Sequence, residues 1–232
     1  MKKYIFLLAS IAFLFASCEK DNYDAPNALL TGKIVYNGET MQLKHNEVTM
    51  QLYEPGWELS NQTYMNVHVA QDGTFSSSVF SGKTYKLIRV ANLGPWKNPT
   101  TADTITITVK GNTEIEVPVE PFFTISSATA TYDMSSRIMS ARFSAEQEDV
   151  TKSVEHVGLF VSSTRFVDAN TNKYSKTIPG TSLANLQDID IALDDALPSN
   201  ISYEEYMFVR VGVKTVGCAQ WIYSEPMKVD VK

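Results

Sequence analysis

The sequence reads Thr104-Ile105-Thr106-Ile107-Thr108-Val109 and, after a short Lys110-Gly111-Asn112 segment, Glu114-Ile115-Glu116-Val117-Pro118-Val119-Glu120. Apolar and polar side chains alternate in both stretches. This period of two predicts β-strands that bury one face and expose the other to water. Because glycine and asparagine between the stretches favour a tight turn, we expect the two strands to form a β-hairpin.

The same period of two extends through most of the chain after Leu29. Pro121 cannot donate a hydrogen bond to a strand ladder, so we expect one set of strands to end at Glu120 and a second to follow. The sequence thus predicts an all-β protein of two tandem antiparallel β-sandwich domains, residues 29–120 and 121–232. Further strands of the first domain are expected at 29–36, 48–54, 63–70, 74–80 and 84–91.

The second domain shows two clear alternating stretches. One face of the first carries Met139, Ala141, Phe143 and Ala145, and a longer strand is expected over about 206–216. Residues 157–161 form a further buried run. Residues 164–200 are irregular and acidic, which favours a short helix or an extended excursion over regular strands.

Composition and charge exclude several classes of protein. The 232 residues are 44% hydrophobic and 20% charged, as expected of a globular protein. A formal net charge of -6 disfavours a nucleic-acid partner, since phosphate binding requires a basic face. After the N-terminal region, no apolar run reaches the ~20 residues of a membrane-spanning helix.

The N-terminus has the pattern of an export signal. Lys2 and Lys3 precede an apolar run over residues 5–16, and Phe15-Ala16-Ser17-Cys18 is similar to a bacterial lipobox. We therefore predict a lipoprotein signal peptide at 1–17 and a lipidated tether at 18–28, with Cys18 acylated. The expected location is the outer membrane facing the cell surface; a periplasmic-facing anchor and a plain secretory signal are the alternatives.

Acylation of Cys18 would leave Cys218 as the second of only two cysteines without an intrachain partner, so we expect no disulfide. Loss of Lys2 and Lys3 with the signal lowers the formal charge from -6 to -8. The context Val216-Gly217-Cys218-Ala219 favours a turn or packing residue over a nucleophile.

Three short motifs of the first domain carry a family resemblance. Gly32-Lys33-Ile34, Asp72-Gly73-Thr74-Phe75 and Gly82-Lys83-Thr84-Tyr85-Lys86-Leu87 occur in the order seen in transthyretin-like, carboxypeptidase-regulatory-like domains. An Asp-Gly turn needs a positive φ at Gly73, after which Phe75 is expected to enter the core together with Tyr85 and Leu87.

The end of the second domain, Tyr206 to Val211 with Trp221 and Ser224-Glu225-Pro226, resembles the last hairpin of Ig-like and fibronectin-III-like domains. A lipobox with these two domains resembles an uncharacterised family of Bacteroidetes lipoproteins. Its members are typically encoded beside glycan-importing outer-membrane transporters. The resemblance implies a setting in polysaccharide uptake and supplies no catalytic residues.

No motif for catalysis or cofactor binding is present. The three histidines, His45, His68 and His156, form no metal-binding pair, and G-x-S-x-G, P-loop and G-x-G-x-x-G patterns are absent. Residues 168–172, Asp-Ala-Asn-Thr-Asn, alternate oxygen side chains as calcium loops do but lack the later glycine and glutamate, which favours a polar turn. We predict no catalytic residue, no metal, no cofactor and no enzyme activity. Carboxylate clusters that a hydrolase could use occur at 146–149, 188–190, 194–195 and 204–205.

Aromatic side chains are the strongest candidates for ligand contact. Trp57 and Trp96 occur beside glycine and proline, which places them in loops. Sugar rings stack on exposed indoles while neighbouring amides, such as that of Asn98, bind hydroxyls. We therefore predict a ligand site at Trp57, Trp96 and Asn98, with capping of the sandwich core as the alternative role of both indoles.

Two functions follow as hypotheses. The first is a non-enzymatic, glycan-binding accessory lipoprotein of a polysaccharide-uptake system, whose partners are the outer membrane, a poly- or oligosaccharide and an outer-membrane glycan transporter complex. The second is a structural, scaffolding or adhesin-like subunit that docks on outer-membrane partners without binding sugar. Whichever holds, the second domain is expected to fold without the first.

Overall fold

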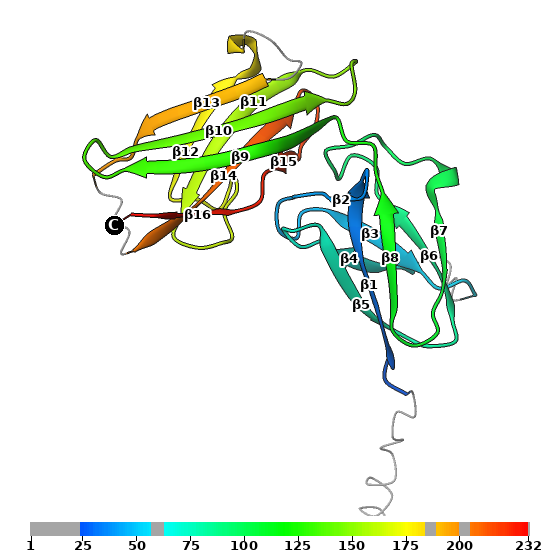
Figure 1. Ribbon diagram of the computed structural model, residues 1–232. Coiled ribbons are helices and arrows are strands. Elements are labelled where there is room, and N and C mark those ends of the chain that lie inside the picture. Colours follow the sequence, from blue (N-terminus) through cyan, green and yellow to red (C-terminus); the bar gives the residue numbers. More distant parts are fainter. Residues whose placement is uncertain (1–23, 57–62, 184–188, 200–204, 232) are drawn as a thin grey trace, which may run out of the picture.

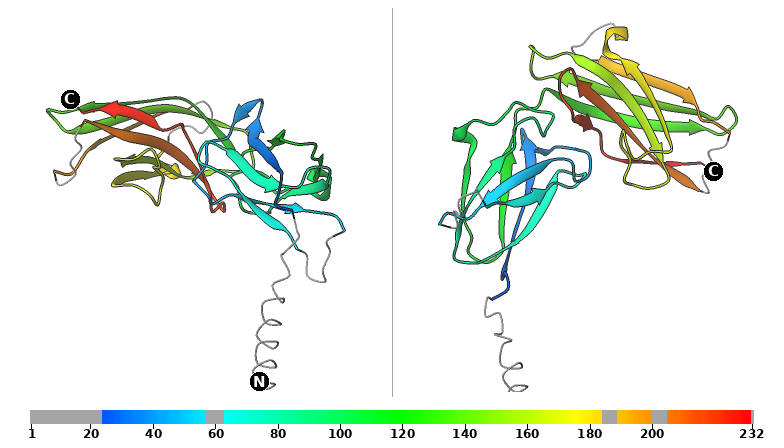
Figure 2. Two further views of the ribbon diagram at one scale, coloured as in Figure 1. Left: turned by 90° about the horizontal axis from the view of Figure 1, so that it is seen from below. Right: turned by 180° about the vertical axis from the view of Figure 1, so that it is seen from behind.

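The computed structural model describes residues 24–56, 63–183, 189–199 and 205–231. These residues form two β-sandwiches whose strands run at a steep angle to each other, so that the molecule is bent (Figures 1 and 2). The predicted fold class, two tandem β-sandwich domains, is confirmed, and among the described strands every pair except β1 with β8 is antiparallel. No helix in the described ranges is both long and apolar enough to span a membrane.

The N-terminal domain packs two four-stranded sheets face to face. One sheet contains β1 (Ala28–Tyr36), β2 (Glu39–Thr40), β5 (Thr74–Val79) and β8 (Thr113–Pro118). The other contains β3 (Thr49–Tyr53), β4 (Met65–His68), β6 (Thr84–Arg89) and β7 (Ile105–Thr108). A short 3-10 helix, η1 (Thr101–Asp103), precedes β7. Alternate residues of both sheets point inward, which explains the period of two in the sequence.

The expected hairpin between residues 104–109 and 114–120 is wrong. β7 pairs with β6 in one sheet, whereas β8 runs parallel to β1 in the other, with Leu30 opposite Thr113. The intervening turn therefore crosses from sheet to sheet. Both strands still bury one face, because they face the same core from opposite sides: Ile107 is 4% exposed and Val117 is fully buried.

The C-terminal domain packs a three-stranded sheet on a five-stranded sheet. The smaller sheet contains β9 (Phe123–Asp133), β10 (Ile138–Gln147) and β13 (Ile189–Ala196). The larger contains β11 (Val154–Ser162), β12 (Tyr174–Pro179), β14 (Tyr206–Thr215), β15 (Trp221–Tyr223) and β16 (Met227–Asp230). β14 pairs with both β15 and β16, in keeping with the resemblance to the last hairpin of an Ig-like domain.

The expectation of irregular structure over 164–200 is wrong for two segments. β12 and β13 are edge strands of their sheets, and η2 (Gly180–Ser182) follows β12. β12 buries no side chain fully, and its residues alternate only between half-buried and exposed. An edge strand of this kind carries too little apolar contrast for its periodicity to be recognised.

The motifs that carry the family resemblance adopt the expected geometry. Gly73 has a φ of 78°, and the carboxylate of Asp72 accepts the backbone N–H of Thr74 at 3.2 Å. Phe75 is 4% exposed, and Tyr85 and Leu87 are buried. Most buried apolar side chains form one cluster that continues from this core into the C-terminal domain, while Phe160, Val167 and Tyr223 form a second, smaller one.

Candidate functional site

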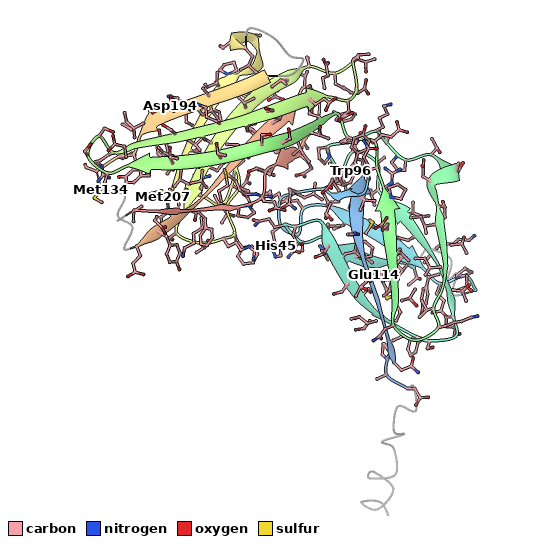
Figure 3. All side chains as sticks on the ribbon, in the orientation of Figure 1. His45, Trp96, Glu114, Met134, Asp194 and Met207 are labelled. Atoms are coloured by element: carbon pink, nitrogen blue, oxygen red, sulfur yellow. The ribbon has the colours of Figure 1, made fainter. Side chains whose placement is uncertain are left out.

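The 41–48 loop, which follows β2, joins the N-terminal domain to the larger sheet of the C-terminal domain. The carbonyl of Gln42 accepts the N–H of Tyr223 at 3.1 Å, and the carbonyl of Leu43 accepts Nη1 of Arg210 at 2.9 Å. Figure 3 shows His45 of this loop beside the C-terminal domain, where its ring lies 5.0 Å from that of Phe166. The loop is therefore a fixed contact between the domains.

Arg210 is the centre of this contact. Its side chain is fully buried, its Nε donates to the carbonyl of Ser224 at 2.8 Å, and its guanidinium lies 4.5 Å from the ring centroid of Tyr223. Burial lowers the pKa of Arg210 to about 10. A guanidinium held by carbonyls of both domains ties their positions together, because pulling the domains apart would leave the buried carbonyl of Leu43 without its donor.

A second loop of the N-terminal domain, residues 92–98, is attached to the connector between the domains. The N–H of Lys97 donates to the carbonyl of Glu120 at 2.9 Å, and the N–H of Phe122 donates to that of Pro95 at 3.1 Å. The thiol of Cys218 in the C-terminal domain donates to the carbonyl of Gly94 at 3.5 Å. These bonds hold the loop against both the connector and the β14–β15 turn.

An open cleft of about 330 Å³, here called the junction cleft, lies between this loop and the C-terminal domain. It is lined by Asn92, Gly94, Trp96, Lys97, Asn98, Phe122, Asp149, Lys152, Gly217, Cys218 and Ala219. A second hollow of about 340 Å³ shares Lys97 and Asn98 with it and continues toward Arg89 and Asp103. Together they form a polar recess that both domains contribute to.

Trp96 lies at the domain junction (Figure 3). It is in a loop, as expected, but only 3% of its surface is exposed. Gly94 packs so closely on the indole that a Cβ at this position would overlap it. Trp96 also forms an isolated β-bridge with Pro121. The indole therefore forms part of the wall of the junction cleft. Its burial fits the alternative role, capping of the sandwich core, better than stacking on a sugar ring.

Asn98 is exposed and lines the junction cleft. Its Oδ1 accepts the backbone N–H of Asn92 at 2.7 Å, and its Nδ2 donates to Oδ1 of the same residue at 3.0 Å. These two bonds use one of the two amide hydrogens and fix the plane of the amide. Beside it, Nζ of Lys97 pairs with Glu120 at 2.8 Å, which raises the pKa of Lys97.

The C-terminal domain adds Phe122 and Lys152, which sequence reasoning did not identify, and Asp149, which it named only as part of a carboxylate cluster. Nζ of Lys152 lies 4.8 Å from the ring centroid of Phe122. The carboxylate of Asp149 accepts both the N–H and the hydroxyl of Thr151, which lowers its pKa. No local pattern marks these residues as a site, since they meet Asn98 only through the contact between domains.

Several predicted residues lie outside the described ranges: Cys18, Trp57, and the acidic residues Asp188 and Glu204. Cys218 is a free thiol whose pKa is raised by burial, which disfavours a nucleophilic role. In residues 168–172, Asp168 is 2% exposed and its carboxylate accepts the N–H groups of Asn170 and Thr171. The segment is thus a turn closed by the carboxylate of Asp168. Across the described residues, no three His, Cys, Asp or Glu side chains form a group that could hold a metal.

The fold and the cleft together define a class of protein: two β-sandwich domains in fixed contact, with a polar recess lined by residues of both. A family model named "Protein of unknown function (DUF3823) N-terminal domain" matches residues 28–120, and its C-terminal counterpart, DUF3823_C, matches residues 123–228. The chain belongs to the DUF3823 family.

Solved structures of similar proteins come from Bacteroides and Parabacteroides species. A DUF3823 family protein from Bacteroides ovatus is 30% identical, with a TM-score of 0.79 over 88% of this chain and 100% of that one. One from Parabacteroides merdae is 30% identical, with a TM-score of 0.77 over 90% and 100%. A protein from Bacteroides uniformis, described as a candidate carbohydrate-binding protein, shares the fold at 16% identity, with a TM-score of 0.70 over 88% and 99%. No curated protein matches the chain.

Proposed function

We propose that this protein is a non-enzymatic, lipid-anchored protein of the outer membrane that binds an oligosaccharide in the junction cleft, as an accessory of a polysaccharide-uptake system. The observation that carries the proposal is the convergence of Asn98 from one domain with Lys152 and Phe122 from the other on a single open recess. The lipobox-like residues up to Cys18 support the anchor. The described function of the Bacteroides uniformis relative supports the ligand class.

The lining of the cleft suits a polyhydroxylated ligand. Asn98 retains one amide hydrogen after bonding Asn92, and Lys152 offers ammonium donors, so both can bind sugar hydroxyls. The carboxylate of Asp149 is an acceptor whose orientation is fixed by Thr151. Polar groups whose positions are already fixed cost less conformational entropy to order when a ligand binds.

The experiment is a binding survey of the soluble chain of residues 19–232, which keeps both domains, against plant, host and microbial polysaccharides. Affinity gels find the ligand and calorimetry of its oligosaccharides measures the Kd. Lys152→Ala and Asn98→Ala should each raise Kd about 5- to 15-fold, the effect of a lost hydrogen bond of roughly 1–1.5 kcal/mol. Lys86→Ala, a change at an exposed lysine in β6 outside the cleft lining, is the matched control and should leave Kd unchanged.

Two outcomes would contradict the proposal. Absence of binding across a broad panel would favour the scaffolding alternative. Binding that survives both cleft substitutions would place the sugar site elsewhere on the molecule.

A further inference from the structure

The exposed apolar residues of the N-terminal domain gather at one end. Among its described residues, the large apolar side chains with substantial exposure are Leu29, Tyr64, Met65 and Phe80, at 37–41% each. Tyr64, Met65 and Phe80 line one hollow, together with Leu52, which lies opposite Met65, and Val79, which lies opposite Ala28 at the start of β1. We call this the tether end. It lies away from the C-terminal domain (Figure 1).

A shallow apolar hollow of about 200 Å³ is part of the tether end. Tyr64, Met65 and Phe80 line it together with Pro26, the third residue of the described chain. The N–H of Phe80 donates to the hydroxyl of Tyr85 at 3.0 Å, so the backbone beneath the hollow is fixed. Apolar surface of this kind, gathered at one end and rimmed by polar turns, is typical of an interaction surface.

The chain leaves the domain at this same surface, in a fixed position. Oδ1 of Asn27 accepts the N–H of Ser81 at 2.8 Å, and Oδ1 of Asn112 accepts that of Leu29 at 3.0 Å. Two lysines accompany the apolar groups. Lys83 is 54% exposed and forms an ion pair with Glu54 at 3.1 Å, and Lys110 is exposed in the turn before β8. Aromatic and apolar side chains with flanking lysines are the composition that favours a membrane–water interface.

Tether length identifies the occupant of this surface. Five residues lie between Cys18 and Asp24, the first described residue, and the six residue-to-residue steps span only about 20 Å when fully extended. An acyl chain on Cys18 would therefore keep the lipid surface within that distance of the tether end. A protein partner would have to enter this narrow gap, whereas the lipid is already there.

We propose that the tether end docks on the lipid surface, with Tyr64, Met65 and Phe80 entering the headgroup region. The inference rests on the lipid anchor of the proposed function. Docking would orient the whole molecule, because β1 runs from the tether end toward the domain junction. β1 has nine residues and rises about 3.3 Å per residue, so the junction cleft would lie roughly 30 Å from the lipid surface.

The test uses the full chain, acylated at Cys18 and reconstituted into phosphatidylethanolamine–phosphatidylglycerol vesicles that contain spin-labelled lipid. A fluorophore is attached at Phe80→Cys in one sample and at Met134→Cys in the other. Met134 is a matched exposed apolar residue at the far end of the C-terminal domain (Figure 3). Unsubstituted protein corrects for label on Cys218. We expect at least threefold stronger quenching at position 80 than at position 134.

A second variant serves as a control for misfolding of the N-terminal domain caused by the label at position 80. A fluorophore at Lys110→Cys reports the same surface, and Met65→Ser with Phe80→Ser in that chain should weaken its quenching to what the anchor alone gives, while leaving the circular dichroism unchanged. Equal quenching at positions 80 and 134 in protein that floats with the vesicles would overturn docking alone. Failure of every variant to float would overturn the anchor, and the docking with it.

Discussion

The two loops that join the domains do so in opposite ways. The 41–48 loop presents the carbonyl of Leu43 to a fully buried arginine, Arg210. The 92–98 loop is bonded to the connector by its backbone, and beside it lies an open recess of about 330 Å³. The buried contact at Arg210 thus involves one loop and the open cleft involves the other. A substitution can therefore change the contact and leave the cleft intact, or the reverse.

Removing the buried guanidinium should have the largest effect. Arg210→Ala leaves the carbonyls of Leu43 and Ser224 buried without donors, and we expect the free energy of unfolding to fall by about 3–5 kcal/mol. Urea denaturation measures this loss. Arg142→Ala is the control: Arg142 forms a two-bond pair with Asp194, but both side chains are about half exposed, so the loss should stay within about 1 kcal/mol. Similar losses in the two variants would show that the contact contributes little.

Separating the domains should have the next largest effect. The isolated C-terminal domain, residues 121–232, keeps both of its sheets but loses the carbonyls of Gln42 and Leu43. We expect it to fold, with an unfolding free energy lower by about 2–3 kcal/mol than that of the same domain in the intact chain. Domain-resolved urea curves make the comparison. Aggregation of the isolated domain would contradict the domain boundary. An unchanged unfolding free energy would show that the contact between Arg210 and Leu43 does not stabilise the C-terminal domain.

A smaller effect should come from the loop beside the cleft. Gly94→Ala places a methyl group against the Trp96 indole, and overpacking of this kind costs about 1–3 kcal/mol. Because the indole forms part of the cleft wall, the same change should weaken ligand binding. Ala91→Ser, at an exposed position just before the 92–98 loop, should change thermal stability by no more than about 0.5 kcal/mol. If Gly94→Ala matches that control, the loop adjusts freely and does not shape the cleft.

The smallest effect concerns alkaline pH. The hydroxyl of Tyr36 in β1 donates to Glu148 of the C-terminal domain at 2.7 Å, and this bond, followed by burial, raises the pKa of Tyr36. The folded state holds the proton more tightly than the unfolded state. The resulting stability is complete below the unfolded pKa of about 10 and is lost as pH rises through the higher folded pKa. Urea midpoints should therefore fall more steeply above pH ~10 for the wild type than for Tyr36→Phe; parallel curves would contradict the contribution.

Local patterns predicted much of the fold. They identified β1, β3, β5 and β6 and the Asp72-Gly73 turn, because alternation and turn chemistry depend on neighbours in sequence. They misassigned the partner of β8, since an alternating strand shows which face it buries and not which strand lies beside it. They missed β12, whose edge position leaves both faces partly wet.

The candidate site was less predictable. Trp96 and Asn98 were identified from loop context and do lie in one recess, but nothing near them in sequence indicates that Lys152 would join them. Arg210 was part of a recognised strand pattern, without any sign that its charge would be buried against Leu43.

By itself, the sequence determined the all-β class, the inward face of each alternating strand and the tight turn at Gly73. Each of these depends on residues only a few positions apart. The tertiary structure alone decided that β8 runs beside β1, that Arg210 locks two domains through the carbonyl of Leu43, and that a cleft opens beside Trp96. Leu43 and Arg210 are 167 positions apart, and a contact of that range forms only when both domains are folded and their buried surfaces meet.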